Sequence, residues 1–129
     1  HRHPPWGDCM TTTKTFLKNI TQQAALLDQL PVGITVIDLE GRILYYNETC
    51  AHLVDRQPEY LGEDIRSCHK KAVSVVAIDR ILDDILTGRK QEVYYETERT
   101  GQTLAVTISP YEVDGKRGGA IQSIVVKRT

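Results

Sequence analysis

Two stretches of the chain carry apolar residues at helical spacing. In each, the apolar positions follow one another at steps of 3, 4 and 3 residues, which places them on one face of a helix. These positions are Leu17, Ile20, Ala24 and Leu27 in the first stretch and Val75, Ile78, Leu82 and Ile85 in the second. The pattern predicts helices over residues 11–30 and 72–87, the first of them ended by Pro31. A shorter helix is expected over residues 47–54, with Asn47 as its N-cap.

Most of the remaining sequence has the pattern of β-strands. Alternating and β-branched apolar residues predict five strands, over residues 33–39, 42–46, 91–99, 102–109 and 120–127. Turn-forming residues at 38–41 lie between the first and second strands, and those at 100–101 lie between the third and fourth. Residues 110–119 are expected to form a longer connection before the fifth strand. Two runs of strands separated by a helical block predict the α+β class, with a single antiparallel sheet.

The composition fits one globular domain and narrows the classes of function. The chain has 129 residues, and 16 basic against 17 acidic residues give a net charge of -1. This balance lacks the positive charge expected of a nucleic-acid binder. The apolar runs are too short to span a membrane, and the three cysteines form neither a disulfide framework nor a zinc-site pattern. We therefore expect a reducing, cytoplasmic setting, with neither nucleic acid nor membrane as a partner.

The chain divides into three parts. Residues 1–10 differ in composition from the rest and are interpreted as a leader or an added remnant. Residues 11–30 form the N-terminal amphipathic helix, and residues 31–129 form the domain proper. The apolar stripe of the leading helix must be covered, and two interpretations stand. The helix folds back on its own domain, or the stripe forms the seam of a homodimer, through Leu17, Ile20, Ala24 and Leu27.

Two segments before the second long helix carry recognisable motifs. Residues 33–47 read GITVIDLEGRILYYN, and residues 58–62 read PEYLG. Together with the order of elements, they resemble the PAS domain family, over about residues 26–128. The resemblance implies a five-stranded antiparallel sheet with helices on one face around a ligand pocket. It also implies a sensory or regulatory domain of a signal-transduction or transcription-regulating protein, with an output domain outside this sequence.

The segment that leads into the second long helix, residues 65–71, reads IRSCHKK. It resembles the corresponding segment of PAS domains that bind haem and sense carbon monoxide, which makes His69 the candidate axial ligand of haem b. The positive end of the helix dipole favours the neutral imidazole that ligates iron. Lys70 and Lys71 are placed to meet the haem propionates. In the alternative interpretation, His69 only caps or hydrogen-bonds the start of the helix.

The haem segment departs from the family pattern in two ways. Lys70 stands where the family has proline, and no methionine follows Met10, so the family's second iron ligand is missing. The strand that supplies that ligand offers Tyr94 and Tyr95 instead. The iron would therefore take its second ligand from elsewhere in the chain or remain five-coordinate.

Three further residues, Tyr95, Leu104 and Ile78, are expected to contact the ligand in the pocket. The ligand would be a small molecule, a gas or haem, and its binding would shift the sheet and the long helix and so reach the output domain. In the alternative hypothesis, the domain binds no ligand and serves dimerisation or protein interaction. No catalytic pair, triad or phosphate-binding glycine loop is visible, so the chain is not expected to be an enzyme.

Overall fold

The computed structural model describes residues 20–68 and 72–128, and in them the predicted order of elements is confirmed. The helices are α2 (Ile20–Asp28), α3 (Glu48–Val54) and α4 (Ala72–Leu86), with the short 3-10 helices η1 (Pro58–Tyr60) and η2 (Ile65–Cys68) between α3 and α4. The strands are β1 (Gly33–Asp38), β2 (Ile43–Tyr46), β3 (Val93–Arg99), β4 (Gln102–Val113) and β5 (Lys116–Val126).

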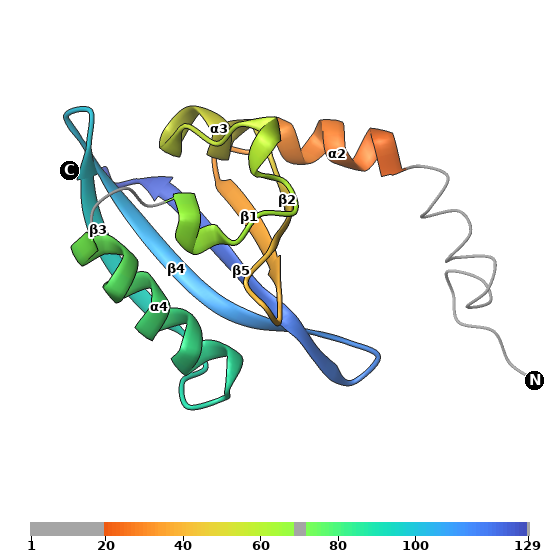
Figure 1. The fold of residues 1–129 in the computed structure, drawn as a ribbon. Helices are drawn as coiled ribbons and strands as arrows, with labels where there is room; N and C mark the ends of the chain where they lie inside the picture. Colours follow the sequence, from red (N-terminus) through yellow and green to blue (C-terminus); the bar gives the residue numbers. More distant parts are fainter. Residues whose placement is uncertain (1–19, 69–71, 129) are drawn as a thin grey trace, which may run out of the picture.

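The five strands form one antiparallel sheet in the order β2-β1-β5-β4-β3, with α3 and α4 on the same face (Figure 1). The first strand of the chain therefore pairs with the last one at the centre of the sheet. This arrangement confirms the predicted α+β class and the antiparallel sheet with helices on one face.

The core lies between the sheet and the helices. Because side chains alternate along a strand, every second residue of the inner strands faces the helices. The buried residues of β4 and β5 follow this period, and α4 covers them with its own apolar face. The fully buried apolar side chains of these three elements are Ile78, Leu82, Ile85, Leu104, Val106, Ile108, Ala120 and Ile124.

The prediction of a longer connection over residues 110–119 is wrong. Strand β4 continues to Val113 and β5 begins at Lys116, so a tight hairpin replaces the loop. Asp114 at φ 54° and Gly115 at φ 77° form its turn, and an Asp-Gly pair favours such turns. Pro110 lies within β4, at a point where β3 no longer pairs with the strand. Its missing N–H therefore costs no hydrogen bond to β3.

Other element boundaries shift by a few residues. The described helix α2 ends at Asp28 rather than at residue 30, and β3 begins at Val93 rather than at residue 91. The predicted leader, residues 1–10, and the first part of the predicted helix lie outside the described residues. None of the helices within residues 20–68 and 72–128 is long and apolar enough to cross a membrane.

Asn47 joins three elements at the start of the domain. Its side-chain oxygen accepts hydrogen bonds from the backbone N–H of Ile34 at 2.8 Å and of Cys50 at 3.0 Å. Its side-chain nitrogen donates to the backbone carbonyls of Leu27 and Val32, both at 2.8 Å. The side chain is fully buried, and it caps α3 as predicted. One amide thus ties the end of α2 to β1 and α3.

The substitution Asn47→Ala should lower the free energy of unfolding by about 3 kcal/mol, because it removes a helix cap and leaves buried backbone groups without partners. Urea unfolding monitored by circular dichroism measures this difference. The matched control is Gln29→Ala, which removes an exposed amide whose one hydrogen-bond partner among the described residues is the Ala25 carbonyl; it should cost less than about 0.5 kcal/mol. Equal losses in the two variants would contradict the anchoring role of Asn47.

Candidate functional site

An arginine is buried on the inner side of the sheet. Arg56 is only 8% exposed. Its Nε donates to the Thr35 hydroxyl at 3.4 Å, and its Nη2 donates to the side-chain oxygen of Gln122 at 3.0 Å. The Thr35 hydroxyl also lies 3.1 Å from the Cys50 thiol, which is fully buried. Thr35, Cys50, Arg56 and Gln122 are called here the interior polar cluster.

The fold brings this cluster together from distant parts of the sequence. Thr35 in β1 and Gln122 in β5 are directly opposite each other in the sheet, and both are buried. Helix α3 ends at Val54, and the left-handed backbone of its C-cap residue Asp55 (φ 56°) turns the chain before Arg56. The central strand pair and the end of a short helix therefore converge on one guanidinium.

The charge of Arg56 is not balanced by an acid among the described residues. It is the one charged residue in the described part of the chain that is buried, and no described carboxylate forms an ion pair with it. Its acidic neighbours Asp55 and Glu59 are exposed. Arginine stays protonated, and an unpaired buried charge costs several kcal/mol, of the order of 3 or more, which neutral acceptors only partly offset. The site therefore favours a negatively charged partner.

Two tyrosines lie close to this charge. Burial raises the pKa of Tyr95, while an interaction with Gln122 and the charge of Arg56 act in the opposite direction. Burial also raises the pKa of Tyr46. The charge of Glu59 raises this pKa further, whereas the charge of Arg56 lowers it. Both side chains pack against the core, whereas Tyr94 is 56% exposed and points away from it. The neighbours of Arg56 thus include neutral phenols as well as apolar residues.

The structure places the predicted pocket residues in the core. Ile78 on α4 and Leu104 on β4 are buried in one cluster, and Tyr95 on β3 packs against it. They therefore lie on the inner side of the sheet, and their contact with a ligand stays a prediction. His69, Lys70 and Lys71 lie outside the described residues, so the haem ligand stays a prediction. The part of the chain described contains no group of three or more His, Cys, Asp or Glu side chains that could hold a metal ion.

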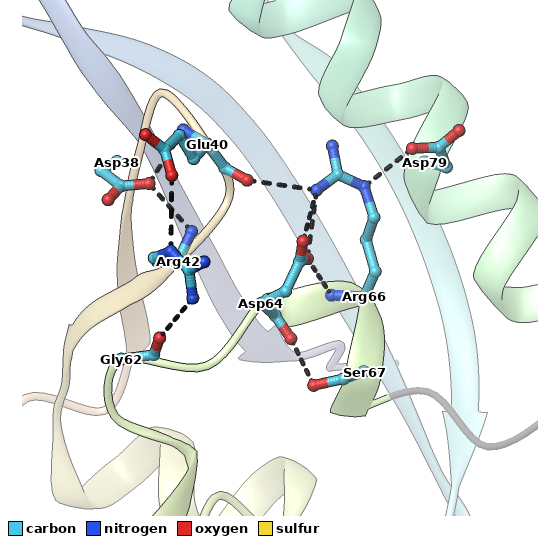
Figure 2. Close-up of polar contacts among 8 residues, drawn as sticks. All are labelled: Asp38, Glu40, Arg42, Gly62, Asp64, Arg66, Ser67 and Asp79. Carbon is cyan, nitrogen blue, oxygen red and sulfur yellow. Dashed lines mark hydrogen bonds and ion pairs between the residues drawn. The ribbon is translucent and has the colours of Figure 1, made fainter.

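A second polar network, centred on Arg66, fixes the segment that leads toward residue 69 (Figure 2). Arg66 donates to Asp64 at 2.9 Å, to Asp79 on α4 at 2.7 Å and to the backbone carbonyl of Glu40 at 3.3 Å. Gly41 belongs to the opening motif, and its backbone φ of +87° is a conformation that favours glycine. A Cβ at this position would also lie 2.7 Å from the Arg66 side chain. The network joins η2, α4 and the β1–β2 turn.

The interior polar cluster was not predicted from the sequence. One signal was present, because Gln122 falls on the buried phase of β5, between Ala120 and Ile124. A polar residue at such a position indicates a partner inside the core. Arg56 gave no such signal, since it follows α3 in a segment without apolar periodicity. Only the folded chain brings it to the sheet.

Comparisons with known proteins agree on the fold. A family model described as a PAS domain matches residues 23–125. The C-terminal domain of a protein from Streptococcus mutans is similar over 83% of this chain and 84% of that chain, with a TM-score of 0.70 and 21% identity. The PAS domain of BvgS from Bordetella pertussis is similar over 87% and 88%, with a TM-score of 0.59 and 21% identity.

A sensory box sensor histidine kinase from Vibrio cholerae is similar over 92% of this chain and 99% of that chain, with a TM-score of 0.60 and 15% identity. A search of curated proteins gave no match. The family match runs from α2 to β5 and so includes the whole sheet with the helices on its inner face. These findings confirm the resemblance seen in the opening motif, and the chain belongs to the PAS domain family.

Proposed function

We propose that this domain is a sensory module that binds a small ligand between the inner face of the sheet and the helices. The observation that carries the proposal is the buried guanidinium of Arg56, which no described carboxylate neutralises. A core built only for packing is filled by apolar side chains, whereas a binding site sets a few polar groups in apolar surroundings. The similarity to a sensor histidine kinase supports a sensory role.

Binding would reach the rest of the protein through β5. Gln122 contacts Arg56 and belongs to the last strand, which pairs with both β1 and β4. A ligand that forms hydrogen bonds with Arg56 or Gln122 would change the position of this strand relative to its neighbours. We propose that this change is passed to an output domain in a signal-transduction or transcription-regulating protein.

Native mass spectrometry of the purified protein tests ligand binding. We expect a mass above that of the polypeptide under native conditions, lost on denaturation, or a mass increase when a small-molecule mixture is added. A native mass equal to that of the polypeptide, with no addition from the mixture, would argue against the sensory-ligand proposal. The denatured sample is the control, because it reports any covalent modification separately.

Haem b is one specific ligand that we propose to test. The proposal rests on the resemblance around His69, between the end of η2 at Cys68 and the start of α4 at Ala72. Burial raises the pKa of Tyr95 and so disfavours the phenolate that ligates iron, which leaves Tyr95 a poor substitute for the missing methionine. When bound, haem would supply an iron centre for a gas, and His69 would hold it.

If haem is the ligand, protein purified with haem supplied should show a Soret band, and His69→Ala should weaken it severalfold. His52→Ala is the matched control, because His52 is an exposed histidine on α3 whose only ion-pair partner among the described residues is Glu48. An absent Soret band, or one unchanged in His69→Ala, would exclude haem bound through His69.

The second candidate function is dimerisation through the leading helix. Of the predicted seam, Ala24 and Leu27 are half-buried, and Leu17 lies outside the described residues. On the same stretch, Leu26 is 66% exposed and Leu30 is 40% exposed. Exposed leucines beside a half-buried stripe favour a partner for this helix, and we propose a second copy of the chain.

The double substitution Leu26→Glu with Leu30→Glu should convert a dimer into a single chain, because it places charge directly beside the half-buried stripe of the proposed seam. Sedimentation equilibrium measures the mass in solution. Leu39→Glu is the control, since Leu39 is similarly exposed, at 52%, but lies in the β1–β2 turn. A wild-type protein that sediments as one chain, or a double variant that remains dimeric, would count against this seam.

A further inference from the structure

Arg56, the one buried charge among the described residues, indicates the chemistry of the ligand. We propose that the ligand carries one carboxylate group, which Arg56 binds on the inner side of the sheet. This inference rests on the proposed ligand-binding function and adds the class of ligand to it.

The hydrogen bonds of Arg56 leave one edge of its guanidinium without an acceptor among the described residues. Nε and Nη2 donate to Thr35 and Gln122, and no described residue accepts a hydrogen bond from Nη1. The two existing bonds fix the plane of the guanidinium against β1 and β5. A carboxylate matches the planar donor fork of arginine with two parallel hydrogen bonds. The free edge of Arg56 is therefore held ready for such a group.

The balance of charge favours a carboxylate over a phosphate. Arg56 is the one buried charged residue of the described chain, so the interior there offers a single positive charge. A carboxylate neutralises it, whereas a phosphate monoester carries about -1.5 to -2 at pH 7 and would leave negative charge buried. The phenols of Tyr46 and Tyr95 are neutral at pH 7, and burial raises the pKa of both further, so they add hydrogen-bonding capacity without adding charge.

Two sources can supply this carboxylate. One is a small organic acid, and the other is a propionate of haem. The chemistry at Arg56 is the same in both cases, so the experiment must separate them. Matched pairs of ligands that differ only in the carboxylate provide the means.

The first measurement compares each acid with its neutral amide on the wild-type protein. Isothermal titration calorimetry with propionate and propionamide, and with benzoate and benzamide, tests the charge at nearly constant shape. We expect at least one acid to bind at least about tenfold more tightly than its amide, as a charge-assisted hydrogen-bonded pair predicts. Haem and its dimethyl ester form a third pair, followed by the Soret band. Preference for haem over the ester identifies a propionate as the source.

The second measurement compares variants. Arg56→Gln removes the charge and should weaken acid binding about tenfold or more, while Arg56→Lys keeps the charge without the donor fork and should have an intermediate effect. Arg99→Gln is the matched control, because Arg99 is exposed on β3 and has no ion pair among the described residues. Without ligand, Arg56→Gln should unfold at the same temperature as the wild type or higher, because it removes an unbalanced buried charge.

The outcomes separate this inference from the function on which it rests. If acids and amides bind equally well, or if Arg56→Gln binds acids like the wild type, ligand binding stands and the carboxylate inference is overturned. If neither acids, amides nor haem bind and the purified protein carries no ligand, both are overturned. A lower unfolding temperature of ligand-free Arg56→Gln, with no acid effect on the wild type, would assign Arg56 a structural role. The acid–amide comparison needs no variant and stands even if Arg56→Gln fails to fold.

Discussion

The buried charge of Arg56 is the constraint on which the organisation of the interior depends. A guanidinium remains charged at any physiological pH, and placing it in apolar surroundings costs free energy that two neutral acceptors only partly restore. The side chain nevertheless lies against the central strands, bonded to Thr35 and Gln122. The core around it consists mainly of aliphatic side chains. A buried charge with no acidic partner among the described residues supports the proposed ligand binding.

Strand pairing and side-chain hydrogen bonds connect the elements around Arg56. Strands β1 and β5 pair directly, so Thr35 and Gln122 lie opposite each other at the centre of the sheet. Asn47 fastens α3 to β1 and to the end of α2, and α3 in turn leads into the segment that carries Arg56. On the other side of the hairpin, Arg66 joins the β1–β2 turn to α4 (Figure 2). The elements around Arg56 are therefore connected to α2, the first described helix, and to β5, the last strand.

Most of the fold could be predicted from the sequence because local residue patterns specify its individual helices, strands and turns. The helical spacing of Ile78, Leu82 and Ile85, the cap at Asn47 and the turn at Gly41 each specify an element through its own residues. The β4–β5 hairpin differs from the prediction because Pro110 favours the end of a strand in the sequence, whereas in the fold it lies where β3 no longer pairs with β4 and Asp114-Gly115 supplies the turn.

The candidate site was predictable only in part. Tyr95, Leu104 and Ile78 lie on the inner side as their alternation and spacing indicated. The interior polar cluster depends instead on contacts between residues far apart in the chain, such as Arg56 and Gln122, 66 residues apart. No local pattern specifies such a pairing. The one local indication of the cluster is Gln122, a polar residue at a buried position of β5.

A crystal structure of the protein as purified from cells, or soaked with the acid that binds most tightly, tests the central claim most directly. The account predicts electron density for a carboxylate within hydrogen-bonding distance of Arg56 Nη1, with the contacts to Thr35 and Gln122 retained. An acidic side chain of the chain itself paired with Arg56, or apolar density packed against a guanidinium without any anion, would contradict it.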